Sequence, residues 1–132
     1  MAQVTVFVNY NGNGTTNHKL SLTDSQNHVG GSNPGDPSGS HNQDNITTNI
    51  EAGDTITWQP QGTVVDVVSI TPKDSHVDFL NTPTHNADGS VSATVKSGFA
   101  GGQMESYNIN YKIKDDNTVY TDDPKMQMNP PS

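Results

Sequence analysis

The sequence predicts an all-β protein, a Greek-key β-sandwich of about seven to eight strands that forms one domain over residues 1–132. Three observations predict this fold class. Apolar and polar residues alternate with a period of two in most apolar runs, and no segment shows the period of about 3.6 that marks a helix. Turn signals rich in Gly, Asn and Asp recur at intervals of roughly 8 to 12 residues. The core is expected to be small, because only 24 of the 132 residues are Val, Ile, Leu or Phe.

The first two elements are strands at residues 4–8 and 18–24. The turn signal "NGNG" at 11–14 should end the first strand, and Leu20 and Leu22 share one face of the second. The short spacing between the two strands favours a hairpin, and a parallel arrangement in another sheet is the alternative. Residues 27–45 are dominated by Gly, Ser, Pro and Asn, which predicts a long loop that is dispensable for folding.

The middle of the chain predicts two strands joined by a turn at residues 52–54, within the stretch 46–59. Residues 63–72 form the most apolar run and are expected to be a central strand. Asp66 interrupts this run, so it is expected to matter structurally if it points inward. Residues 75–80 should form a short extended piece, followed by a loop up to the turn at Asp88.

The last elements are strands at residues 91–96, 106–114 and 124–128, with a short extended piece at 118–121. Met126 and Met128 share one face of the final strand, where core filling is the expected role of a methionine pair. Alternation at each strand predicts a core made of Val6, Val8, Leu20, Ile56, Trp58, Val68, Ile70, Phe79, Val95, Tyr107, Ile109, Tyr111 and Ile113.

Three stretches resemble the cupredoxin family: "IEAGDTITWQ" at 50–59, "ESYNINYKI" at 105–113 and "DPKMQM" at 123–128. The resemblance covers about residues 46–129 and implies a cupredoxin-like sandwich, with an immunoglobulin-like sandwich as the alternative. A type 1 copper site needs two His, one Cys thiolate and a weak axial ligand. The family places these ligands in the stretches that correspond to 59–70 and 112–123, and neither stretch contains His, Cys or Met. The resemblance therefore implies the scaffold without its copper chemistry.

Composition excludes several function classes. The formal net charge is −8 and there is no Arg, which argues against binding to nucleic acid or to an anionic membrane surface. Without cysteine, disulfides and thiolate metal sites are excluded. Residues 1–10 lack the basic and apolar regions of a signal peptide, so we expect a cytoplasmic protein unless a leader has been removed. No catalytic motif is present, and we expect no enzyme.

Two groups of residues are candidates for holding a cation. Asp74, His76 and Asp78 alternate along "DSHVD" and would share one face of an extended segment. The alternative for this group is a solvated strand face.

The second group consists of four carboxylates that flank "NTVY" and could bind Ca²⁺ together with backbone carbonyls: Asp115, Asp116, Asp122 and Asp123. A solvated turn is the alternative, and the sequence favours the structural interpretation for both groups. No other cofactor is expected.

Two functions fit these observations. The first is a non-catalytic interaction or self-assembly module, in which exposed strand edges pair with a second copy or with a protein partner. The second is a small-ligand binding protein, with a carbohydrate as the ligand and Ca²⁺ as a helper, because loops rich in Asn, Asp, Gly and Tyr supply hydrogen bonds and stacking faces.

Overall fold

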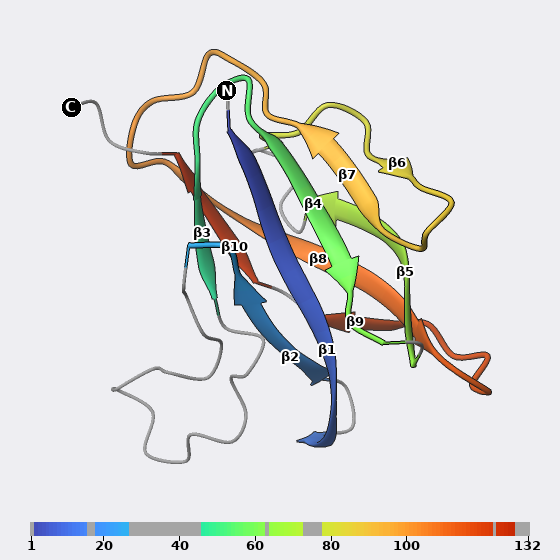
Figure 1. Ribbon diagram of the computed structural model, residues 1–132. Helices are drawn as coiled ribbons and strands as arrows, with labels where there is room; N and C mark the ends of the chain where they lie inside the picture. Colours follow the sequence, from blue (N-terminus) through green and yellow to red (C-terminus); the bar gives the residue numbers. More distant parts are fainter. Residues whose placement is uncertain are drawn as a thin grey trace, which may run out of the picture.

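The computed structural model describes residues 2–15, 18–26, 46–62, 64–72, 78–122 and 124–128, with the backbone alone for 11–15, 18, 19 and 21. The described part is all β, with no helix, and forms a sandwich of two mixed sheets (Figure 1). The predicted all-β sandwich is confirmed, although the described residues form ten strands where seven to eight were predicted. The predicted loop at 27–45 and most of the predicted extended piece at 75–80 lie outside the described residues.

Sheet 1 has the strand order β2-β1-β4-β7-β6, and sheet 2 has the order β3-β10-β8-β5, with β9 also paired to β8. Parallel pairs occur once in each sheet, between β1 and β4 and between β3 and β10, and the other pairs are antiparallel. The strands are β1 (Gln3–Thr15), β2 (His18–Asp24), β3 (Thr47–Ile50), β4 (Thr55–Pro60), β5 (Val65–Pro72), β6 (Thr84–His85), β7 (Val91–Thr94), β8 (Met104–Ile113), β9 (Tyr120–Asp122) and β10 (Lys125–Met128).

The core lies between the sheets and is centred on Trp58 of β4 and Tyr107 of β8, both fully buried. Their rings meet edge to face with centroids 5.5 Å apart, and the Trp58 indole Nε1–H donates to the Tyr107 hydroxyl at 3.0 Å. Aromatic pairs in this arrangement are stabilising beyond the area that they bury. The predicted core role of Met126 and Met128 is confirmed, since both are buried.

The prediction for β5 was wrong in two respects. The strand lies at an edge of sheet 2, and Val68 is 40% exposed. A bulge between Val67 and Ser69 inserts one residue, so the inward positions change from odd to even numbers along the strand. Val67 and Ile70 therefore face the core, whereas Asp66 and Val68 face outward. Of the other predicted core residues, Ile113 is only partly buried, at the end of β8.

Two connecting segments also differ from the prediction. The sequence "NGNG" does not end β1, which continues to Thr15 after a register shift beyond Tyr10, and the predicted hairpin closes where Thr15 pairs with His18. The short strand β6 lies in a segment expected to be a loop. The predicted turn at 52–54 is confirmed, and Gly53 adopts a φ of 89° there, which an L side chain rarely tolerates.

Buried aspartates hold this framework at its turns and sides. Asp54 is 4% exposed and accepts the amide hydrogens of Ala2 and Glu51, both at 2.9 Å. Asp122 is fully buried and joins the two sheets, because it accepts the Leu20 amide of sheet 1 at 3.1 Å and the Tyr111 hydroxyl of sheet 2 at 3.0 Å.

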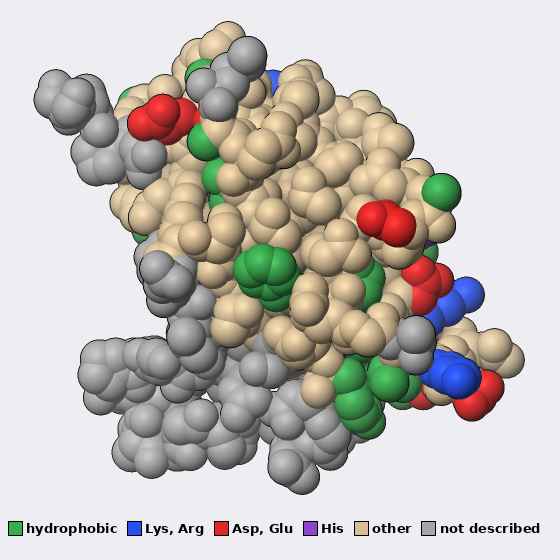
Figure 2. Space-filling view, in the orientation of Figure 1, with side chains coloured by type: hydrophobic (Ala, Val, Ile, Leu, Met, Phe, Trp, Pro, Cys, Tyr) green, Lys and Arg blue, Asp and Glu red, His purple; other side chains and the backbone are tan. Residues whose placement is uncertain are grey.

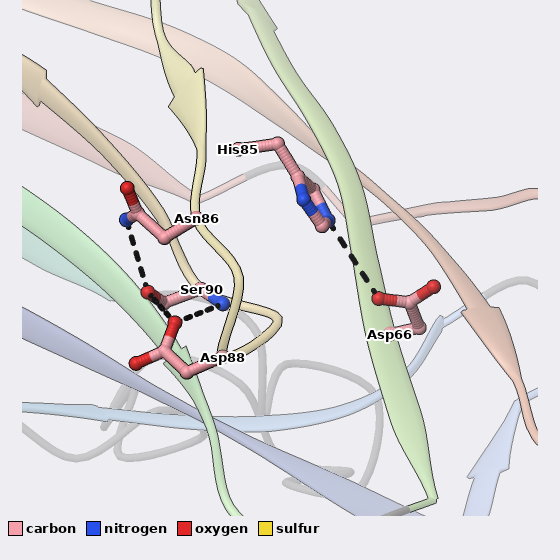
Figure 3. A network of polar contacts seen from close by, with 5 residues as sticks. All are labelled: Asp66, His85, Asn86, Asp88 and Ser90. Carbon is pink, nitrogen blue, oxygen red and sulfur yellow. Dashed lines mark hydrogen bonds and ion pairs between the residues drawn. The ribbon is translucent and has the colours of Figure 1, made fainter.

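The opposite side of the sandwich is joined at the surface. His85 of β6 faces Asp66 of β5, with 3.8 Å between the His85 Nε2 and an Asp66 carboxylate oxygen (Figure 3). The turn after β6 is held separately, since Asp88 accepts hydrogen bonds from both the amide and the hydroxyl of Ser90. These bonds, led by the one from the Ser90 hydroxyl, lower the pKa of Asp88.

Candidate functional site

A cavity of about 250 Å³ opens where the end of β5 meets the beginning of β8. Residues 78–83, which precede β6, and Lys96, which follows β7, complete its wall. The volume is slightly below the roughly 300 Å³ at which pockets for drug-sized ligands begin, so the cavity suits a small ligand. Its lining consists of Ile70, Thr71, Pro72, Asp78, Leu80, Asn81, Thr82, Pro83, Lys96, Glu105 and Tyr107.

The alternation of β8 carries Glu105 into this cavity. Glu105, Tyr107, Ile109 and Tyr111 occupy every second position and all face the core side of the strand. Glu105 is 3% exposed, and its Oε1 accepts the Phe79 amide hydrogen at 3.3 Å. Its Oε2 is buried and has no hydrogen-bond partner among the described residues. A buried polar atom without a partner is uncommon in a folded protein and points to a missing water, ion or ligand.

Burial raises the pKa of Glu105 from 4.5 to about 7, because the charged form loses its hydration. The Phe79 amide and the Lys96 ammonium act in the opposite direction, while the nearby Asp78 carboxylate adds to the increase. Near neutral pH the carboxyl group is therefore divided between its protonated and ionised forms. It can donate a hydrogen bond in the first form and accept one in the second.

The charged residues at the cavity wall already form a pair. The Lys96 ammonium lies 3.9 Å from the Asp78 carboxylate, and both side chains are more than 40% exposed. The second Asp78 oxygen accepts the Leu80 amide hydrogen at 3.2 Å. Because each charge has an opposite partner in solvent, this pair gives the cavity little net charge of its own.

Backbone hydrogen bonds fasten this wall to the sandwich. The Lys96 amide donates to the Phe79 carbonyl at 2.7 Å, and the Asn81 amide donates to the Thr94 carbonyl at 3.0 Å. The Tyr107 hydroxyl is held in the core by Trp58, and burial raises the pKa of Tyr107 so that it stays neutral. Glu105 thus lies beside a wall that hydrogen bonds hold to the sandwich.

The structure gives different outcomes for the predicted cation site of Asp74, His76 and Asp78. Asp74 and His76 lie outside the described residues. Asp78 lines the Glu105 cavity, where its partners are Lys96 and the Leu80 amide.

The predicted carboxylate cluster is spread over different environments. Asp122 points into the core, whereas Asp115 is exposed at a φ of 66° in the turn after β8. Asp116 accepts the Thr118 amide at 2.9 Å and the Tyr120 hydroxyl at 2.6 Å. Asp123 lies outside the described residues. The part of the chain that the structure describes has no group of three or more His, Asp or Glu arranged to hold a metal ion.

Glu105 was not predicted as a site residue, because the strand that corresponds to β8 was expected to begin one residue after it, at Ser106. The signal was present in the sequence. The inward alternation of Tyr107, Ile109 and Tyr111 extends back by one step to Glu105, and a charged residue in register with a core face is informative.

Comparison with known proteins gives no assignment, because neither a protein-family model nor a curated protein matches the chain. Within the described ranges, no helix is long and apolar enough to cross a membrane.

Proposed function

We propose that this protein is a non-catalytic binding protein that holds a small polar ligand of the carbohydrate class in the Glu105 cavity. The observation that carries the proposal is the buried Glu105 Oε2, which has no partner among the described groups while its side chain lines a cavity. Asn81 and Thr82 line the same cavity. The Asn81 side-chain amide nitrogen already donates to Thr94, so the Asn81 side-chain oxygen and the Thr82 hydroxyl are the groups left to meet the hydroxyl groups of a sugar.

The scaffold that we propose is cupredoxin-like and lacks a type 1 copper site. An immunoglobulin-like sandwich is built from two antiparallel sheets. Here each sheet contains a parallel pair, β1 with β4 and β3 with β10, which favours the cupredoxin-like alternative. The "GDTITW" segment forms the turn into β4 and the first part of that strand.

Self-assembly by strand pairing is the competing hypothesis, and features at the sheet edges weigh against it. At β3, the Gln26 side chain donates to the Asn49 carbonyl at 2.6 Å and accepts the Asn49 amide at 2.9 Å, so it occupies the position of a neighbouring strand. At β2, the Leu20 amide already donates a hydrogen bond to the Asp122 carboxylate. Such occupied backbone groups are not available to a second chain.

The edge strands β5 and β6 carry other obstacles to pairing. β5 has a bulge and the outward-facing Asp66, and β6 is only two residues long. On the face shown in Figure 2, the hydrophobic side chains form small groups separated by polar side chains and backbone. An assembly interface normally needs a larger continuous apolar patch.

The proposed role is binding and not catalysis because the second carboxylate of the cavity, Asp78, is engaged. Catalysis by paired carboxylates requires both groups to act on the substrate. Asp78 is held by the Lys96 ammonium and the Leu80 amide, which leaves Glu105 alone to meet a ligand.

The test is a ¹H–¹⁵N NMR titration of the whole chain with a panel of monosaccharides, disaccharides and polyols, with and without Ca²⁺. A ligand should shift the amide signals of Phe79, Leu80, Lys96 and Glu105, and Glu105→Gln should weaken binding. Light scattering of the same samples measures self-assembly. Concentration-dependent dimers without any shift at the cavity would overturn the proposal in favour of an assembly module.

A further inference from the structure

The cavity has an unbalanced charge. Its two other charged groups, Asp78 and Lys96, are 3.9 Å apart and compensate each other. The Tyr107 phenol is neutral, because burial raises its pKa. Among the described residues that face Glu105, no further charged side chain lies within the lining. When Glu105 ionises, its carboxylate is therefore the net charge of the site, with one amide donor from Phe79.

We infer that the ligand carries a primary ammonium group, which supplies the hydrogen-bond donor and the positive charge that Glu105 Oε2 lacks. This inference rests on the proposed function and names its ligand class: a small polyol or sugar in which an amine replaces one hydroxyl. Because Oε2 is itself buried, binding requires the Glu105 side chain to rotate toward the cavity that it lines.

The chemistry of the site favours an ammonium group over its alternatives. A buried carboxylate is stabilised most by a donor that is itself charged, and an ammonium offers three N–H donors. One donor serves Glu105, and the others are available to the Asn81 side-chain oxygen and the Thr82 hydroxyl in the same lining. The formal net charge of −8 attracts cations and repels anions at a distance.

Binding of an ammonium ion should release a proton from the protein. The unliganded Glu105 has a pKa of about 7, so its ionised fraction rises from about one tenth to about nine tenths between pH 6 and pH 8. An alkyl amine, with a pKa near that of a lysine side chain at about 10, remains charged throughout this range. The bound state pairs the carboxylate with the ammonium, and the displaced proton goes to the solvent. The affinity should therefore rise about tenfold from pH 6 to pH 8.

The experiment compares glucamine with sorbitol, which are identical except that glucamine carries an ammonium group where sorbitol has a hydroxyl. Dissociation constants are measured by NMR titration of the whole chain at pH 6 and pH 8. Glucamine should bind at least tenfold more tightly than sorbitol at pH 8 and should show the pH dependence. In Glu105→Gln both differences should disappear. Asp66→Asn, which removes the same charge at an exposed site away from the cavity, should retain them.

A further variant tests the charge argument. Lys96→Met removes the cation that compensates Asp78, so it should strengthen glucamine binding about threefold or more at pH 8. Unchanged or weaker glucamine binding in this variant would contradict the ammonium inference. Equal binding of glucamine and sorbitol in the cavity would overturn the ammonium inference and leave the proposed function standing. If neither these two compounds nor any sugar of the panel shifts the cavity amides, both the inference and the proposed function are wrong.

Discussion

Replacing Asp122 with alanine removes the carboxylate that joins the two sheets at one side of the sandwich. In the native protein this fully buried group accepts the Leu20 amide at 3.1 Å and the Tyr111 hydroxyl at 3.0 Å. A hydrogen bond to a charged group contributes about 1.5–3 kcal/mol, so the loss of both predicts a destabilisation of about 3–6 kcal/mol. The free energy of unfolding of such domains is about 5–15 kcal/mol, so this loss is a large part of the total stability.

Urea unfolding followed by the fluorescence of Trp58 measures this loss, because Trp58 is the single tryptophan and is fully buried. With a slope of about 2 kcal/mol per molar urea, the midpoint should fall by roughly 1.5 M or more. Asp122→Asn keeps one acceptor oxygen and should lose about half as much. Asp66→Ala, at an exposed site, should change the stability by less than about 0.5 kcal/mol. If Asp122→Ala behaved like Asp66→Ala, the role of Asp122 as the joint between the sheets would be refuted.

Three further outcomes are expected. Tyr107→Phe leaves the buried Trp58 indole without its acceptor and should cost about 1–3 kcal/mol in urea unfolding; no measurable loss would contradict this. Since the folded pKa of Glu105, about 7, exceeds its unfolded value of 4.5, its contribution to stability is complete below about pH 4.5 and is lost as the pH rises through 7. Glu105→Gln should remove this dependence of the unfolding free energy on pH, and an unchanged dependence would refute the raised pKa of Glu105. Gly89→Ala meets no atom within 4 Å but must adopt a φ of 88°, so thermal unfolding should show a loss of about 1–2 kcal/mol; an unchanged midpoint would contradict the strain.

Much of the fold was readable from the sequence because its strands obey simple alternation. In β8, Tyr107, Ile109 and Tyr111 occupy every second position, and all three are buried as expected. β5 shows where this logic fails. Its bulge adds one residue and exchanges the two faces, and nothing in "VVDVV" marks the point of insertion. The same run was expected to be central because apolar residues are continuous, although Val68 is largely outward-facing.

The candidate site was less predictable for a physical reason. Carboxylates next to turns are usually solvated, so Asp122 was grouped with Asp115 and Asp116 as one acidic surface. One of the groups that Asp122 actually binds, the Leu20 amide, lies 102 residues away in the sequence. The Glu105 cavity likewise combines β5, β8, residues 78–83 and Lys96. Local patterns can place each element, but they do not show which elements meet across the two sheets.

The most direct test of the account is an NMR titration of the Glu105 side-chain carboxyl carbon in the ¹³C-labelled chain, with and without glucamine. The account predicts a pKa of about 7 in the free protein, produced by burial, and a lower pKa when the ammonium ligand is bound. A free pKa close to 4.5 would show that Glu105 is well solvated. A raised pKa that glucamine leaves unchanged at saturating concentration would show that the ligand does not meet this carboxyl group.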